Sequence, residues 1–161
     1  MQLIPKRNAG FEIGHMIIEK DGKLCNCGKK GCFETYCSIK RLKENIILAL
    51  NLNKKTDAKE IIQILESKKE DEKIQKIINE YLENLLIGIS NVIDIFEPEA
   101  ICLGGSFIYF KDILYIPFIK MYEQKKYVFN KENLPEIKLG ILRNDAGIIG
   151  ATIWQIYQII V

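Results

Sequence analysis

A chain of 161 residues can form one domain with a sizeable core, and we treat residues 1–161 as a single domain. The apolar share of 48% and charged share of 27% are typical of a globular protein, and a net charge of +2 gives no reason to expect nucleic-acid binding by bulk attraction. The most apolar stretch, residues 148–161, is shorter than the ~20 residues that a membrane span needs. We therefore expect a cytoplasmic protein.

Residues 10–34 contain the first cluster of side chains that could bind a metal. This stretch holds the only histidine, and it holds three of the five cysteines, in the spacing H-x9-C-x-C-x4-C: His15, Cys25, Cys27 and Cys32. One imidazole and three thiolates are the Cys₃His set that zinc takes in closed tetrahedral sites. The alternatives are free thiols or, in an exported protein, disulfides. The ligand number and type favour a structural zinc.

Turn residues predict how these donors come together. His15 opens an apolar segment, residues 16–18, that suits a short strand, and Asp21-Gly22 indicates a turn back toward it.

Cys25 and Cys27 would lie on one side of an extended segment because they are two residues apart. Gly28 and Gly31 would then let the backbone fold tightly, so that Cys32 returns to the same point.

The run Glu12-Ile13-Gly14-His15, followed by Cys25-x-Cys27-Gly28-x-x-Gly31-Cys32-x-Glu34, resembles the signature of the ROK family (repressors, uncharacterised reading frames and sugar kinases). The resemblance implies that the His and three Cys hold a structural zinc. It also implies three side chains that hydrogen-bond sugar hydroxyls: Glu12, His15 and Glu34. Residue type alone would make the two glutamates solvated surface carboxylates.

The chain departs from the family pattern at one position. The family usually has Gly directly before the first Glu, whereas this sequence has Phe11, with Gly10 one position earlier. A bulky ring there is expected to shift the backbone that aims Glu12. The sugar contact of Glu12 is therefore less firmly implied than that of His15.

The resemblance implies an α/β fold, namely the C-terminal domain of the actin-like (ribonuclease H-like) ATPase fold with a zinc-binding loop. Family members carry a D-x-G-G-T phosphate loop and a general-base Asp in an N-terminal domain, and neither matches this sequence. We therefore expect a partner that supplies that half, either a missing N-terminal domain or a second chain. The resemblance assigns no catalytic residue here, so we expect no kinase activity from this chain alone.

Helical patterns follow the metal-binding stretch. Residues 39–51 read as a helix capped by Ser38, and a shorter helix is predicted from Thr56-Asp57 to about Ser67, with Thr56 as its cap. Residues 68–73 mix charge signs and read as a solvated connection. Cys37 is expected to be a small core or helix residue.

The strongest helical pattern runs from Ile74 to Phe96, where Pro98 stops it. Apolar residues at spacings of three and four form one face, which we expect to be core: Ile74, Ile77, Ile78, Tyr81, Leu82, Leu85, Leu86, Ile89, Val92, Ile93 and Phe96.

Residues 100–103 read as a buried strand before Gly104-Gly105, with Cys102 as inert core. Alone, this glycine pair indicates an ordinary tight turn. Residues 91–105 again resemble the ROK family, and that resemblance places adenosine and phosphate near Gly104 and Gly105. It therefore implies ATP, with Mg²⁺, as a cofactor of the full-length protein.

The last third of the chain predicts a helix over 112–125, broken or kinked at Pro117, and a strand over 136–142. Asp145 would cap a terminal helix over 146–161, in keeping with the closing motif of the family. An exposed face on that helix, with Trp154, Tyr157 and Ile160, predicts oligomerisation or poor solubility.

The leading hypothesis is the sugar- and zinc-binding half of a ROK-type ATP-dependent hexose kinase, forming a homodimer and binding a small-molecule sugar. The alternative is the sugar-sensing domain of a ROK-type repressor, the only one of these two cases in which DNA would be a partner. A zinc-stabilised nucleic-acid module is a third reading. The near-neutral charge and the absence of interleaved basic and aromatic residues around the cysteines count against it.

Overall fold

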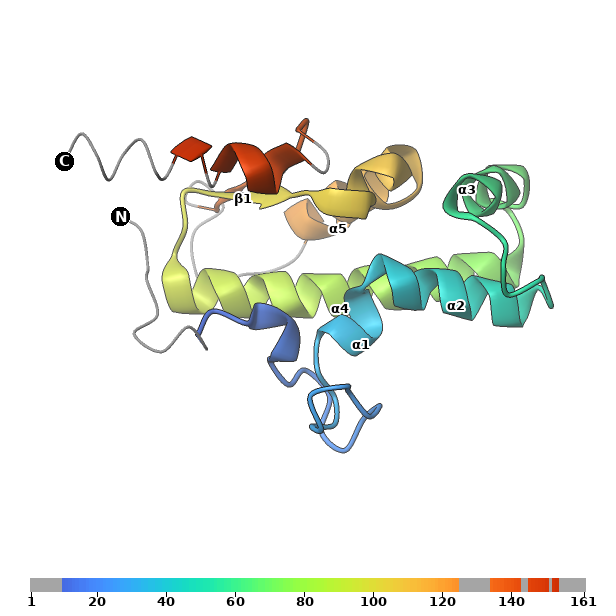
Figure 1. The fold of residues 1–161 in the computed structure, drawn as a ribbon, viewed down its shortest axis with the longest axis horizontal. Coiled ribbons are helices and arrows are strands. Elements are labelled where there is room, and N and C mark those ends of the chain that lie inside the picture. The colour runs from blue at the N-terminus through green and yellow to red at the C-terminus, as the bar shows by residue number, and fades with distance from the viewer. Residues whose placement is uncertain (1–9, 125–133, 143–144, 151, 154–161) are drawn as a thin grey trace. The chain divides into compact units, whose positions relative to one another are not determined.

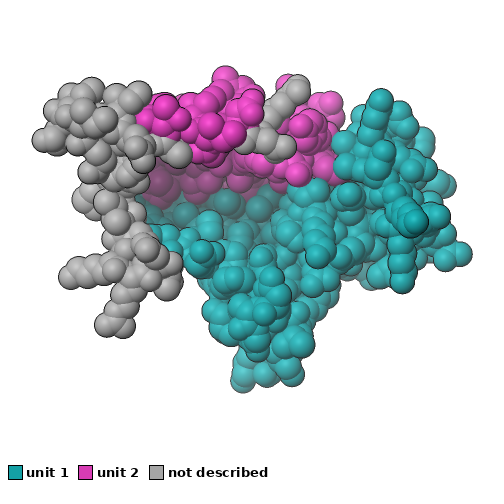
Figure 2. All heavy atoms as spheres, in the orientation of Figure 1, with its two compact units in different colours: residues 1–97 teal, residues 98–161 magenta. Residues whose placement is uncertain are grey.

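The computed structural model describes residues 10–124, 134–142, 145–150 and 152–153. The chain divides into two compact units, Met1–Glu97 (unit 1) and Pro98–Val161 (unit 2), which Figure 2 shows in teal and magenta. Within the described residues, no helix combines the length and apolar character that crossing a membrane requires. The prediction of a single domain over 1–161 stays a prediction.

In its described residues, 10–97, unit 1 is mainly helical beyond the loop of residues 16–33. It contains a short 3-10 helix and four α-helices: η1 (Ile13–His15), α1 (Glu34–Cys37), α2 (Ile39–Ala49), α3 (Ala58–Ser67) and α4 (Glu72–Phe96). The sequence did not predict η1 or α1. In Figure 1, α1 and α2 lie against the long helix α4, which forms the spine of this unit.

Helix α4 ends at Phe96 as predicted, and it begins at Glu72, two residues before the predicted start at Ile74. The Asp71 side chain accepts hydrogen bonds from the backbone N–H groups of Lys73 and Ile74, and Glu97 ends the helix in a left-handed conformation just before Pro98. The predicted apolar face is largely buried, with Ile74, Tyr81, Leu82, Leu85, Leu86, Ile89 and Ile93 in the core. Phe96 is the exception, because its side chain at the helix end is 42% exposed.

The predicted cap of α2, Ser38, is confirmed, and the predicted cap of α3, Thr56, is wrong. The Ser38 side chain accepts a hydrogen bond from the Arg41 N–H. In α3 the cap is Asp57, which accepts from the Glu60 N–H at 2.8 Å, while the Thr56 hydroxyl donates to the Asn53 carbonyl. A carboxylate at this position also interacts favourably with the helix dipole, which a hydroxyl does less well.

Unit 2 is built on a parallel strand pair. Strand β1 (Ala100–Leu103) pairs in parallel with β2 (Glu136–Leu139), with Ala100 opposite Glu136 and Leu103 opposite Leu139. Between them the chain forms η2 (Gly105–Phe110), the π-helical turn η3 (Lys111–Tyr115) and α5 (Ile116–Gln124). Among its described residues, the buried side chains are Phe107, Phe110, Leu114, Phe118, Tyr122 and Ile137.

Pro117 explains why the predicted helix over 112–125 is irregular. Proline has no N–H to donate within a helix. The chain makes a π-turn before it, in which the Ile116 N–H donates to the Lys111 carbonyl, and then continues as α5. The predicted helix is therefore broken, with a change from a π-turn to α5 directly before Pro117.

Two predictions for the strands are wrong. Residues of β1 alternate between exposed and half-buried, so the strand is not buried, and Cys102 is exposed and not core. Strand β2 ends at Leu139, three residues earlier than predicted, and Ile141 beyond it is 87% exposed.

Residues 146–150 and 152–153 are helical, in agreement with the start of the predicted terminal helix. The predicted face of Trp154, Tyr157 and Ile160 lies outside the described residues. The capping role of the Asp145 side chain stays a prediction.

Candidate metal centre

The loop of residues 16–33 is held by turns and not by the predicted strands. It contains only isolated antiparallel bridges, Ile17 with Cys32 and Leu24 with Lys30, within the described residues. The Cys25 N–H donates to the Lys29 carbonyl at 2.8 Å, which closes a tight turn around Cys27. Cys25 and Cys27 therefore lie on a turn and not on an extended segment. In Figure 1 this blue loop projects away from α4, below α1.

Two glycines make the turns possible, as predicted. Gly28 and Gly31 have φ angles of +86° and +77°, a region that other residues enter only with strain. A Cβ on Gly31 would also lie 1.7 Å from the carbonyl oxygen of Glu19. Gly31 is thus required by both conformation and space, whereas a Cβ on Gly28 would meet nothing within 4 Å.

The four predicted donors come together. The ligand atoms of His15, Cys25, Cys27 and Cys32 all lie within 4.8 Å of one another. His15 Nδ1 is 3.6 Å from Cys25 Sγ, and Cys27 Sγ is 3.6 Å from Cys32 Sγ. A tetrahedral zinc with Zn–S near 2.3 Å and Zn–N near 2.0 Å places its donors about 3.5–3.8 Å apart. The donor set and its spacing therefore fit zinc.

The thiols differ in their tendency to ionise without a metal. A hydrogen bond from the Cys27 backbone lowers the pKa of Cys25, but burial and the Glu34 carboxyl outweigh it and raise this pKa to about 12. Burial raises the pKa of Cys32 as well, whereas a hydrogen bond from the Lys29 backbone lowers the pKa of Cys27. Zinc would have to displace the thiol protons, so its binding releases protons.

Glu34 adjoins the donor cluster. It is the first residue of α1, and its Oε1 lies 3.0 Å from Cys25 Sγ and 3.7 Å from His15 Nδ1. Phe33, just before it, packs on α4 at Gly88, where a Cβ would lie 2.2 Å from the ring. This close packing fixes the start of α1, and with it the backbone of Glu34.

A second contact ties α1 to α4. The Tyr81 hydroxyl donates to the Cys37 carbonyl at 2.8 Å, and the Cys37 thiol points at the Tyr81 carbonyl. Burial raises the pKa of both side chains. Cys37 is thus a helix residue outside the donor cluster, as predicted.

Glu12 lies on an unusual backbone with its side chain exposed. Glu12 has φ −79° and ψ 67°, and the Ile13 N–H donates to the Phe11 carbonyl, which defines an inverse γ-turn. Phe11 has a φ of 64°, which costs an ordinary residue about 1–2 kcal/mol. Its ring lies 6.5 Å from that of Phe96, and such a pair contributes about 0.5–1.5 kcal/mol. The two effects are similar in size.

A profile of the ROK family matches residues 7–157 of this chain. The chain belongs to the ROK family. It is 27% identical over 157 residues to the xylose repressor of Caldicellulosiruptor bescii, covering 88% of this chain and 38% of that protein. It is also 27% identical over 157 residues to the glucokinase of Thermotoga maritima, covering 88% of this chain and 48% of that enzyme.

A solved structure confirms the fold. The ROK family glucokinase from Streptomyces griseus, in complex with glucose and AMPPNP, superposes with a TM-score of 0.66 at 24% identity, over 87% of this chain and 49% of that one. The chain therefore has the mixed α/β fold of a ROK domain, with the His/Cys cluster of the predicted zinc loop. It spans about half or less of the length of these relatives.

The predicted nucleotide residues of this ROK domain lie at one end of the strand pair. Gly104 and Gly105 follow β1, and Gly140 follows β2, so all three lie at the carboxyl edge, where open α/β sheets bind ligands. A Cβ on Gly140 would lie 3.4 Å from the Gly104 Cα. Sequence reasoning missed Gly140, because the predicted strand over 136–142 included it, whereas β2 ends at Leu139 directly before it.

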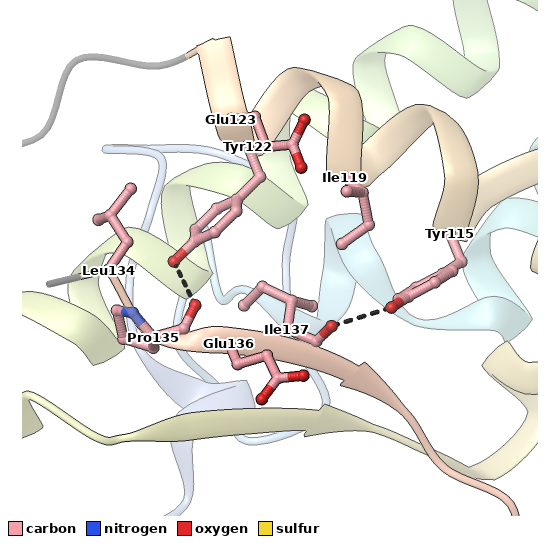
Figure 3. Close-up of a pocket in the computed structure, with 8 residues that line it drawn as sticks. All are labelled: Tyr115, Ile119, Tyr122, Glu123, Leu134, Pro135, Glu136 and Ile137. Carbon is pink, nitrogen blue, oxygen red and sulfur yellow. Dashed lines mark hydrogen bonds between the residues drawn. The ribbon is translucent and has the colours of Figure 1, made fainter. Parts of the chain in front are cut away.

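Unit 2 also contains a hollow of about 380 Å³ between α5 and β2 (Figure 3), lined by Tyr115, Ile119, Tyr122, Glu123, Leu134, Pro135, Glu136 and Ile137. The Tyr115 hydroxyl donates to the Ile137 carbonyl and the Tyr122 hydroxyl to the Pro135 carbonyl, both at 2.9 Å. Burial raises the pKa of Tyr122. Both hydroxyls link the helical segment to the strand, which is a structural role.

Proposed function

We propose that this chain is the sugar- and zinc-binding half of an ATP-dependent hexose kinase of the ROK type. One observation carries the proposal: a Cys₃His cluster whose donor atoms lie within 4.8 Å also has the Glu34 carboxylate 3.0 Å from one of its sulfurs. A metal site that also positions a carboxylate suits a binding loop for hydroxyl-rich ligands. The glucose bound to the Streptomyces griseus relative supports this reading.

Zinc would be held by His15, Cys25, Cys27 and Cys32 and would supply structure, since four protein ligands leave no position for a reacting water. Three thiolates around a divalent ion leave a net charge of −1. The Lys29 ammonium group, which donates to the His15 carbonyl at 2.7 Å, places a positive charge beside the loop. The start of α1 would keep the Glu34 backbone beside the cluster, and repulsion by the thiolates would leave its carboxylate available to a ligand.

Sugar recognition would use three side chains. Because His15 presents Nδ1 to the cluster, its other ring nitrogen is left to hydrogen-bond a sugar oxygen. Glu12 and Glu34 would accept hydrogen bonds from sugar hydroxyls. A site built this way rejects analogues that lack a hydroxyl, because its own polar groups are then left unpaired.

Phosphoryl transfer depends mainly on positioning and on electrostatic stabilisation of the transferred group. In this proposal the chain positions the sugar through unit 1 and contributes Gly104 and Gly105 to an ATP–Mg²⁺ site in unit 2. It supplies no general base. A homodimer and a cytoplasmic location stay predictions.

Replacing Glu34 with glutamine is expected to weaken sugar binding about tenfold or more, because a hydrogen bond to a charged acceptor is lost. Calorimetric titration of the zinc-loaded chain with glucose, fructose, mannose and N-acetylated hexosamines measures this effect. Glu83→Gln, an exposed change on α4, is the matched control and should bind as the parent does. Unchanged affinity in Glu34→Gln, or no binding of any sugar by the parent chain, would overturn the proposal.

A second candidate function is the sugar-sensing domain of a transcriptional repressor, which the match to xylose repressors favours as much as the kinase match favours the first. Nucleotide binding separates the two. The kinase proposal predicts that AMPPNP with Mg²⁺ binds the chain and that ATP displaces it. A sensing domain should bind sugar, xylose included, without binding nucleotide. Equilibrium titration with a fluorescent ATP analogue measures this difference.

A further inference from the structure

Phe11 occupies a backbone conformation that its residue type disfavours. Its φ of 64° lies in the left-handed region, which glycine adopts freely and a phenylalanine does not. The conformation persists beside a tertiary contact, because the Phe11 ring lies 6.5 Å from the ring of Phe96 at an interplanar angle of 53°. Strain of this kind is retained where the surrounding structure enforces it, and it points to a functional constraint.

The strained residue leads directly into the proposed sugar site. The Phe11 carbonyl accepts from the Ile13 N–H at 3.0 Å, and the Glu12 carbonyl accepts from the His15 N–H at 2.9 Å. Glu12 thus lies between a fixed left-handed residue and the short helix η1, which ends at His15. Both torsions at Glu12 are set by these neighbours, although its side chain is exposed.

Phe96 gives the contact a rigid base. It is the last residue of α4, a helix of 25 residues whose apolar face is largely buried. Glu97 then leaves the helix in a left-handed conformation. The ring of Phe96 is therefore placed by the most extensively packed element of unit 1, although 42% of the side chain is exposed.

We propose that the Phe11–Phe96 contact is an aromatic clamp that positions the Glu12 carboxylate for sugar binding. This inference rests on the proposed function, because it assigns Phe11 and Phe96 as positioning residues of the same sugar site. Neither ring is assigned a contact with the sugar. Because Phe96 belongs to α4, its contact with Phe11 restrains the backbone of Glu12, whose exposed carboxylate has no other restraint in this proposal.

The test uses the zinc-loaded 161-residue chain and four variants: Phe96→Ala, Phe96→Tyr, Phe11→Gly and Ile95→Ala. Phe96→Ala removes the clamp and Phe96→Tyr keeps an aromatic ring. Phe11→Gly keeps the backbone conformation without the ring, and Ile95→Ala is the control, because Ile95 is an exposed neighbour on α4. Three quantities are measured: zinc per chain, the dissociation constant for the parent's preferred sugar, and hydrogen exchange at the Ile13 and His15 amides.

Phe96→Ala and Phe11→Gly are expected to retain zinc, to bind sugar about tenfold more weakly, and to exchange both amide protons faster. Phe96→Tyr and Ile95→Ala should match the parent in all three measurements. The clamp is wrong if Phe96→Ala binds sugar as the parent does, if it exchanges both amide protons as the parent does, or if it loses zinc along with sugar, which indicates a general loss of structure.

Hydrogen exchange separates this inference from the proposed function. If the parent chain binds no sugar, the proposed function fails, and with it the clamp's role in sugar binding. Faster exchange in Phe96→Ala with zinc retained would still support the clamp on the Glu12 backbone. Unchanged exchange in that variant would overturn the clamp itself.

Discussion

Replacing Cys32 with serine is expected to abolish zinc binding and to unfold the loop of residues 16–33. Cys32 is fully buried, and it also forms the bridge to Ile17 that closes the loop. Structural zinc contributes on the order of 10 kcal/mol, which is comparable with the whole stability of a small domain. Elemental analysis should give about one zinc per parent chain and none in the variant, with a lower free energy of unfolding.

Cys102→Ser is the matched control for this loss. Cys102 is also a free thiol, but it is exposed on β1 in the other unit. It should keep one zinc per chain and the parental unfolding curve. Chelation of the parent chain should reproduce the effect of Cys32→Ser. Full zinc occupancy in Cys32→Ser would contradict a structural metal. So would a parent chain whose free energy of unfolding is unchanged by chelator.

Replacing Gly31 with alanine should be nearly as damaging, although no ligand is removed. The new Cβ would lie 1.7 Å from the Glu19 carbonyl oxygen, and this neighbour is backbone that cannot turn aside. Relief requires the loop to open, which separates Cys32 from Cys27. We expect a loss of more than about 3 kcal/mol in the free energy of unfolding and a weakened zinc affinity. Thermal unfolding and competition with a zinc chelator measure the two effects.

Gly28→Ala separates the clash from backbone strain. Its φ of +86° is as unfavourable for alanine as that of Gly31, but the added Cβ meets nothing within 4 Å. Only the strain remains, so we expect a cost of about 1 kcal/mol with zinc retained. Equal losses in both variants would show that the contact with Glu19 does not govern the loop.

The donor set and the main helices could be predicted because their signals are local or chemically specific. A histidine and three cysteines within eighteen residues limit the chemistry, and the apolar spacing of α4 together with Pro98 sets its extent. The resemblance to the ROK family was confirmed over nearly the whole chain. The assignment of Glu12, Glu34, Gly104 and Gly105 to ligands stays a prediction.

The wrong predictions concern residues whose conformation or burial is decided by tertiary contacts. Residues 16–18 have strand-forming side chains, but in the described part of the chain they find only an isolated bridge, so they stay irregular. Cys102 was predicted as core from residue type, yet the face of β1 that carries it is exposed. The left-handed conformation of Phe11 was not predicted, although the glycine that the family usually has at this position was a signal for it.

The fit of Phe33 against Gly88 has a consequence for changing this protein. The ring lies where even a methyl group on the helix would overlap it, so the sizes of the two residues are interdependent. A larger side chain at position 88 calls for a smaller one at position 33, directly before Glu34. Redesigning the face of α4 would thus move the start of α1, and with it the backbone of Glu34, even with every residue of the loop left unchanged.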